Sequence, residues 1–171
     1  MEKLYCGGKF HFDCMEEDYL ENASKDYRAA LLGDVNKLLR GSGSIRISDD
    51  ISYIGPYYFE TGNMIDSDIV RKEMQMIENC TCALFLLEDS SCPGTVSELI
   101  YAAALQKKIC VVYVKDENET ESSLRSPCWY PIIQSRLINK NSVTVIQCPD
   151  LEQAKKKILE MAAFHIFQES S

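Results

Sequence analysis

A chain of 171 residues is about the length of one domain and can bury a substantial apolar core, so we treat residues 1–171 as a single domain. Its 18 lysines and arginines are outnumbered by 26 aspartates and glutamates, which gives a formal net charge of −8. This balance argues against nucleic acid as a partner, because a nucleic-acid surface needs clustered positive charge.

No apolar run approaches the roughly 20 residues that a membrane-spanning helix needs, and the first residues lack the apolar region and cleavage site of a signal peptide. We therefore expect a cytoplasmic protein without a membrane partner. The eight cysteines include no CxxC pair and there are two histidines, so no metal site is predicted. Several cysteines fall within or beside predicted strands, where a reduced thiol packs as a small hydrophobic side chain: Cys6, Cys82, Cys110 and Cys148.

The first predicted strand covers residues 4–6 and ends at Gly7 and Gly8. Paired glycines after a strand are typical of a tight turn where the backbone approaches a ligand. With Lys9 they would offer amides and a cation to a phosphate, but no complete glycine-rich phosphate motif is present, so a plain turn with an exposed lysine is the alternative. Tyr5 is either a core residue or, at the end of the strand, a hydroxyl that reaches into a site.

Apolar residues recur at helical spacing over residues 27–39, which predicts the first crossover helix. Glycines and serines at residues 41–44 end this helix. A second strand is expected over residues 45–54, with an interruption at Asp49 and Asp50.

Three adjacent aromatic residues, Tyr57, Tyr58 and Phe59, follow this strand in a turn that is too aromatic for a solvated connection. We interpret the turn as a pocket wall or lid. A flat apolar ligand such as a nucleobase would stack well on Tyr57 or its neighbours, and local packing onto the sheet edge is the alternative.

The second predicted helix covers residues 66–79 and begins near Ser67 or Asp68, which are both good N-cap residues. Glu73 lies on this helix, just before the strand that leads to the next turn. Its carboxylate is either a solvated charge or a second acidic group that converges on a pocket at that turn.

Apolar runs at residues 82–87 and 109–114 flank a turn and helix at residues 92–107, which predicts a βαβ unit. Ligands bind outside the carboxyl ends of parallel strands, so Glu98 in this helix points toward the expected pocket. The spacing also fits a capping box, in which Thr95 and Glu98 satisfy each other's backbone amides. The two roles are compatible, because the helix dipole favours an ionised carboxylate in the first turn.

An aromatic turn at Trp129 and Tyr130 precedes a fifth strand at residues 143–146 and a closing amphipathic helix. Together with residues 57–59 this turn predicts a large apolar patch, which usually marks an interface or a ligand groove. We therefore expect a homodimer or a larger homo-oligomer.

The order of these elements predicts a three-layer doubly wound α/β fold, flavodoxin-like or Rossmann-like, with a five-stranded parallel sheet in the order 2-1-3-4-5. The switch point then lies between the first and third strands, so the turns that follow these two strands meet there. A single pocket would hold Tyr5, Gly7, Gly8, Gly94 and Glu98.

Three stretches of the sequence together resemble the nucleoside 2-deoxyribosyltransferase family: residues 4–8, 77–87 and 93–112. The similarity is clearest over residues 69–114. The family also includes relatives that hydrolyse deoxynucleoside 5′-monophosphates. The resemblance implies a small-molecule substrate, which is a nucleoside or a nucleotide.

The resemblance also implies roles for particular residues. The family motif, a glycine followed at short spacing by Glu-Leu, falls on Gly94 and Glu98, which makes Glu98 the nucleophile that attacks the anomeric carbon. The family's first-strand tyrosine falls on Tyr5, which would position or tune that carboxylate. The acidic residue that assists proton transfer to the leaving base falls best on Glu73, with Asp68 second.

Cys92 stands where transferases of the family often carry an aspartate that contacts the base. The complete set of residues expected to bind substrate is Gly7, Gly8, Asp68, Cys92, Gly94 and Tyr57.

A carboxylate at the anomeric carbon can stabilise an oxocarbenium-like state and trap it as a covalent glutamyl-sugar intermediate, without a metal or an organic cofactor. Attack by a second base gives deoxyribosyl transfer, and attack by water gives hydrolysis. Two alternatives stay open: a deoxynucleoside 5′-monophosphate or NAD-type N-glycosidase, and a non-catalytic nucleotide-binding module in which Glu98 only caps a helix.

Overall fold

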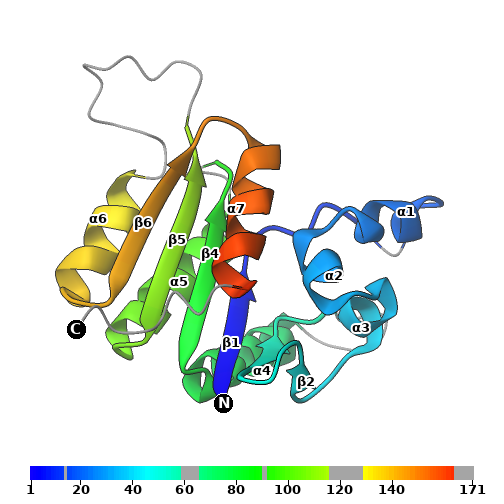
Figure 1. Cartoon of the computed structure of the whole chain (residues 1–171), viewed down its shortest axis with the longest axis horizontal. Coiled ribbons are helices and arrows are strands. Elements are labelled where there is room, and N and C mark those ends of the chain that lie inside the picture. Colours follow the sequence, from blue (N-terminus) through cyan, green and yellow to red (C-terminus); the bar gives the residue numbers. More distant parts are fainter. Residues whose placement is uncertain (14, 59–65, 90–91, 116–128, 164–171) are drawn as a thin grey trace.

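The computed structural model describes residues 1–13, 15–58, 66–89, 92–115 and 129–163 (Figure 1). In chain order its elements are β1 (Glu2–Gly7), α1 (Tyr19–Ser24), α2 (Tyr27–Leu32), α3 (Val35–Arg40), β2 (Ile45–Arg46), β3 (Ile51–Gly55), α4 (Asp66–Asn79), β4 (Cys82–Leu87), α5 (Pro93–Ala104), β5 (Lys108–Val114), α6 (Trp129–Ile138), β6 (Val143–Cys148) and α7 (Leu151–Ala163).

The strands of the described part form one sheet in the order β2-β3-β1-β4-β5-β6. From β3 to β6 all neighbouring strands are parallel, and this part has the order that the sequence predicted. The switch point between β1 and its neighbours therefore brings the ends of β1 and β4 together, with Gly7 paired to Phe85. The prediction of a doubly wound α/β fold is confirmed.

The prediction of one interrupted strand over residues 45–54 was wrong, because this segment forms an antiparallel pair, β2 and β3. Two interactions close the turn between them. The Ile47 amide donates to the Ile51 carbonyl at 3.0 Å, and the Arg46 guanidinium donates to the Asp49 carboxylate. The sheet thus gains an antiparallel edge strand and has six strands in all within the described residues.

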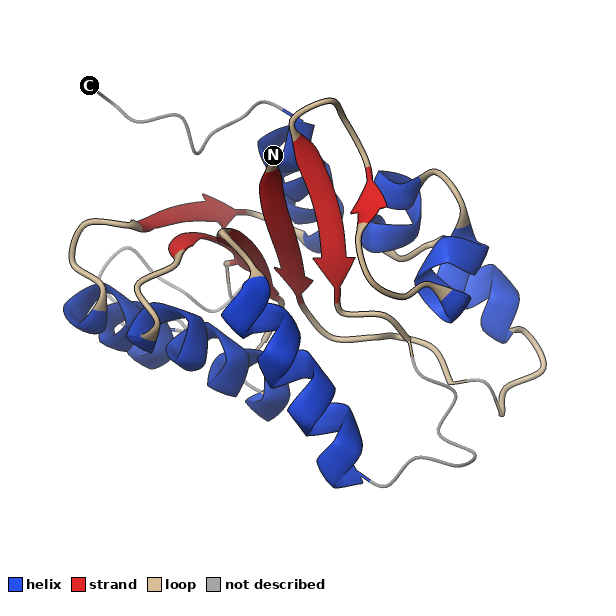
Figure 2. Ribbon diagram, turned by 90° about the horizontal axis from the view of Figure 1, so that it is seen from below, coloured by secondary structure: helices blue, strands red, loops and turns tan. Residues whose placement is uncertain are grey.

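Helices cover both faces of the sheet (Figure 2). On one face α4, α5 and α6 pack over a buried cluster that includes Tyr5 and Phe85. On the other face α7 and the group α1 to α3 pack over a second buried cluster that includes Cys6 and Leu84. Because successive strand residues face opposite sides, Tyr5 belongs to the α5 side and Cys6 to the α2 side.

The first crossover is not the single helix predicted over residues 27–39. Gly33 adopts φ 67° and ends α2 in a left-handed cap, which a residue without Cβ does at little cost. Asp34 then caps α3 by accepting from the Asn36 amide at 2.8 Å. The break separates α2 from α3. Helix α2 begins beside the end of β1, where Tyr27 donates to the Gly7 carbonyl at 3.1 Å.

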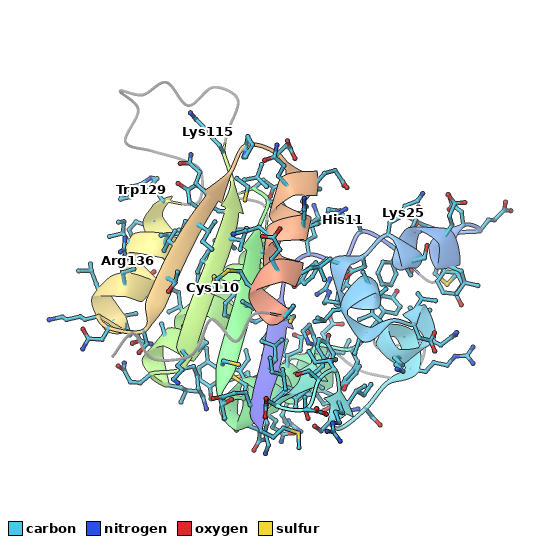
Figure 3. All side chains as sticks on the ribbon, in the orientation of Figure 1. His11, Lys25, Cys110, Lys115, Trp129 and Arg136 are labelled. Atoms are coloured by element: carbon cyan, nitrogen blue, oxygen red, sulfur yellow. The ribbon has the colours of Figure 1, made fainter. Side chains whose placement is uncertain are left out.

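Across the described ranges, no helix combines the length and the apolar character that crossing a bilayer requires. The expected apolar patch is present only in part. Tyr57 is buried, whereas Trp129 and Tyr130 on α6 are 39% and 61% exposed, and Figure 3 shows Trp129 on the outside of that helix. The homo-oligomer stays a prediction, and α6 is now the surface on which it rests.

Candidate functional site

The candidate site lies where β1 ends, because α5 packs Glu98 against this point. A Cβ atom built on Gly7 would lie 2.5 Å from Cδ1 of Phe85 and 3.0 Å from Oε2 of Glu98. A glycine is therefore required here for close approach. Gly8 is less restricted, since its Cβ would lie 3.5 Å from the nearest atom, Cβ of Leu86.

The capping-box alternative for Glu98 was wrong. The helix α5 begins at Pro93 with Cys92 as its N-cap, so Glu98 lies in the second turn and Thr95 is already inside the helix. Proline at the first helical position explains the earlier start, because its fixed φ suits a helix and its missing amide needs no acceptor there. Glu98 is therefore free of a capping role, and it faces Gly7 instead.

Tyr5 contributes a buried hydroxyl to the site. The residue is fully buried between Phe85 and the α5 layer, with the two rings 6.2 Å apart. Its hydroxyl lies near enough to lower the pKa of Glu98, yet it has no hydrogen-bond partner of normal geometry among the described residues. A buried hydroxyl without a partner costs free energy unless a ligand or a small movement satisfies it. We read it as a donor available to the site.

The charges of two carboxylates, Glu98 and Glu73, act on this hydroxyl. Burial raises the pKa of Glu98 to about 8, the negative charge of Glu73 adds to that rise, and Tyr5 and Arg28 oppose it. Burial also raises the pKa of Glu73, against the charge of Arg28. The Glu73 charge acts on Tyr5 as well, so the three groups form one electrostatic unit.

Asp68 does not join this unit. Its side chain is 43% exposed and pairs with Arg71 on the surface of α4, with 3.4 Å between the charged atoms. Asp68 and Glu73 were the two candidates for the second carboxylate. The charge of Glu73, and not that of Asp68, acts on Glu98.

Cys92 and Gly94 lie on the turn and first residues of α5. Cys92 is buried, with its sulfur 3.7 Å from Oδ1 of Asp89. Burial, followed by the charges of Asp89 and Glu88, raises the pKa of its thiol, while Lys9 lowers it. Gly94 is exposed, and a Cβ atom there would meet nothing within 4 Å, so no close approach requires this glycine.

The placement of Tyr57 contradicts its predicted stacking role. The residue is 1% exposed, its hydroxyl donates to the Gly43 carbonyl at 3.1 Å, and its ring meets Tyr53 edge-on at 5.3 Å. It belongs to the cluster on the α2 side of the sheet, opposite Tyr5. Both faces of the ring are thus occupied by the core, and local packing was the correct alternative. Phe59 lies outside the described residues.

The sequence interpretation missed Arg28, which is fully buried beside the β1 turn. Its guanidinium pairs with Asp26 and donates to the carbonyls of Gly8 and Lys9, each at 3.1 Å. One signal could have found it: an arginine two residues after an N-cap aspartate, on a helix that is otherwise apolar. That pattern alone does not distinguish a buried pair from an exposed one.

A cavity of about 180 Å³ lies on the α2 side of the Gly7-Gly8 turn. Cations from separate segments contribute to its wall, and His11 approaches Glu88 there, with 2.5 Å between Nε2 and Oε2. In Figure 3 His11 lies between α7 and the α1 to α3 group. The cavity is lined by Lys9, His11, Phe12, Asn22, Lys25, Asp26, Tyr27, Glu88, Leu151 and Lys155. Among the described residues, no three His, Cys, Asp or Glu side chains are grouped to hold a metal ion.

No protein-family model matches this chain, and a comparison with curated proteins finds no match. Among solved structures, the chain is similar to the CMP N-glycosidase BcmB of Clostridium botulinum, with a TM-score of 0.53 and 14% sequence identity. The similarity covers 96% of this chain and 100% of that one. At this identity the likeness shows a shared fold, the three-layer α/β arrangement whose β1 and β4 ends carry the site described above.

Proposed function

We propose that this protein cleaves the N-glycosidic bond of a nucleoside or nucleotide. The observation that carries the proposal is that Glu98 packs against Gly7 at the end of β1, with its Oε2 3.0 Å from a Cβ built there, while Glu73 and the buried Tyr5 hydroxyl act on it electrostatically. A pair of carboxylates is what cleavage through an oxocarbenium-like state requires: one at the anomeric carbon, and one proton donor for the departing group. The fold shared with a CMP N-glycosidase supports the proposal.

In the proposed reaction the Glu98 carboxylate attacks the anomeric carbon as the bond to the base breaks. The electron pair of that bond passes to the base nitrogen, which takes a proton from Glu73. The sugar is then held as an ester of Glu98, and Tyr5 donates to the carboxylate oxygen that is not esterified. In the second step an incoming base or a water molecule attacks the same carbon, returns a proton to Glu73 and frees Glu98.

The coupling of the two carboxylates suits these two reaction steps because the pair shares protons. Glu73 raises the pKa of Glu98 through its negative charge, so the pair loses its last proton near pH 8, the value of Glu98. Below that point the pair carries one negative charge and one proton, and the proton rests mainly on Glu98 because its pKa is the strongly raised one. Transfer of this proton to Glu73 gives the reactive form, which has an ionised nucleophile and a protonated acid. We therefore expect activity at neutral pH and a decline above about pH 8.

Transfer and hydrolysis remain two outcomes of the same intermediate. The sequence resemblance favours deoxyribosyl transfer, in which a second base takes the sugar. The structural likeness to a CMP N-glycosidase favours release of the base from a nucleotide. Entry of water into the site after the first step decides between them.

The test is a substrate panel with matched variants. Deoxynucleosides, nucleoside 5′-monophosphates including CMP, and NAD are each incubated with and without free adenine, and bases are separated by chromatography. Base exchange supports transfer, and base release alone supports hydrolysis. Asp68→Asn is the control for Glu73→Gln, because both remove a carboxylate from α4 but Asp68 pairs with Arg71 at the surface. Saturable binding of these compounds without any turnover would contradict the proposal.

A further inference from the structure

We propose that Arg28 is a positioning residue for this site, which fixes the β1 turn against which Glu98 packs. The inference rests on the proposed function, because its kinetic test measures the proposed reaction. It concerns a buried charge that takes no part in the bond-making and bond-breaking steps described above.

The guanidinium of Arg28 is saturated with acceptors in a fully buried position. Its Nε and Nη2 bind the two oxygens of Asp26 at 2.8 and 2.7 Å, a bidentate pair. The same group donates to the carbonyls of Gly8 and Lys9 at 3.1 Å and of Cys6 at 3.5 Å. The planar fork is thereby fixed in one orientation.

Tyr27, the preceding residue, completes the arrangement. Its hydroxyl donates to the Gly7 carbonyl at 3.1 Å, so two consecutive residues of α2 hold the carbonyls of all four residues from Cys6 to Lys9. The ring of Phe10 lies 3.7 Å from the guanidinium carbon and covers its face. The whole turn after β1 is thus attached to the start of α2.

This attachment matters to the reaction because Gly7 forms the surface on which Glu98 lies. The Glu98 Oε2 atom lies 3.0 Å from the position that a Gly7 Cβ would take, so a shift of the turn changes the space around the carboxylate directly. A misplacement of about 1 Å can lower a rate by roughly 100-fold. Stability alone does not explain a buried ion pair, because replacing such a pair with well-packed apolar side chains is often neutral or stabilising.

The charge of Arg28 also reaches the carboxylates. Burial is the largest influence on the pKa of Glu98 and of Glu73 and raises both, and Arg28 opposes the rise at each. The charged or titratable groups that act on Glu98 are Glu73 from α4, Tyr5 from β1 and Arg28 from α2. Removal of the arginine charge should therefore raise the pKa of Glu98, whereas a lysine should leave it near its present value.

Two substitutions separate the geometric effect from the charge effect. Arg28→Lys keeps the charge but loses the planar fork, and Arg28→Met loses both. We expect Arg28→Lys to lower kcat by about 10- to 100-fold with KM changed by less than about threefold and the pH profile unchanged. Arg28→Met should lower kcat further and move the alkaline limb of the profile to higher pH. Arg40→Lys, at an exposed arginine of α3, is the matched control and should behave as the wild type.

Nuclear magnetic resonance provides a readout that does not depend on turnover. Amide signals of Gly7 and Gly8 should move in Arg28→Lys but not in Arg40→Lys, and the Glu98 carboxyl should titrate at higher pH in Arg28→Met. If the proposed reaction does not occur, these signals should still behave as predicted. Failure of the proposed function can therefore be distinguished from failure of the inference about Arg28. If Arg28→Lys does not fold, Tyr27→Phe removes only the bond to Gly7, and its lowered kcat supports the inference. Unmoved glycine signals together with wild-type kcat in the folded variant would overturn it.

Discussion

Glu98→Gln should change how stability depends on pH, because the wild-type protein holds a carboxyl group with a strongly raised pKa. Burial and then the charge of Glu73 raise that pKa from its ordinary value of 4.5 to about 8. The folded state therefore binds a proton more tightly than the unfolded state. The stability that this proton contributes is fully present below pH 4.5 and is lost as the pH rises through about 8.

The size of the effect follows from the same two values. One pKa unit corresponds to about 1.36 kcal/mol, so the interval from 4.5 to about 8 amounts to about 5 kcal/mol, of which about 4 kcal/mol falls between pH 5 and pH 9. Glutamine cannot ionise and does not contribute this slope. The difference in unfolding free energy between wild type and Glu98→Gln should therefore shift by about 4 kcal/mol in favour of the variant over that range.

Urea unfolding of both proteins, followed by circular dichroism at a series of pH values, measures the difference directly. Asp68→Asn is the control, because this carboxylate is exposed and outside the electrostatic unit. Its unfolding curve should follow that of the wild type to within about 0.5 kcal/mol at every pH. Parallel pH dependences for wild type and Glu98→Gln would show that Glu98 titrates normally, and the account of the site as a coupled pair of partly buried carboxylates would be refuted.

Three further predictions concern the site. Gly7→Ala places a Cβ 2.5 Å from Phe85 and 3.0 Å from the Glu98 carboxylate, so it should abolish most activity and lower stability by about 1 to 3 kcal/mol. Gly8→Ala should have a far smaller effect on both activity and stability. Chemical unfolding and base-release assays compare the two variants. Glu73→Gln removes the like charge that raises the pKa of Glu98, so the Glu98 carboxyl should titrate at lower pH in nuclear magnetic resonance spectra, and an unmoved titration would contradict the coupling. 2′-Deoxyadenosine should react much faster than adenosine, because a 2′-hydroxyl withdraws electrons from the anomeric carbon; equal rates of base release would exclude a deoxyribosyl-specific site.

The sequence predicted the parallel order of strands and the meeting of two turns, because both follow from periodicity and chain connectivity. Gly7 and Glu98 lie together for that reason: the ends of β1 and β4 must be neighbours at a switch point. The sequence also marked Glu73 as a candidate second carboxylate, and its charge acts on Glu98. Helix α4, which carries it, precedes β4 and packs on the same face of the sheet as α5.

Features that depend on side-chain packing could not be read from the sequence. Tyr57 looks the same in the sequence whether its ring faces a ligand or the core. Its contacts with Tyr53 and with the segment after α3, at Gly41 and Gly43, decide that it is buried. The start of α5 at Pro93 is an exception, because a proline at the first helical position is itself a sequence signal, and this start removes the capping role of Glu98. Arg28 was missed because several of its acceptors are backbone carbonyls, which no sequence pattern marks, and because the spacing to Asp26 does not distinguish a buried pair from an exposed one.

The central claim is that Glu98 acts on the anomeric carbon, and the most direct test compares initial rates of base release by wild type, Glu98→Gln and Asp68→Asn on the preferred substrate at neutral pH. The account predicts that Asp68→Asn retains the wild-type rate while Glu98→Gln, folded to the same extent, loses at least about 1,000-fold, roughly 4 kcal/mol of transition-state stabilisation. A purified Glu98→Gln protein that releases base at the wild-type rate would contradict the account.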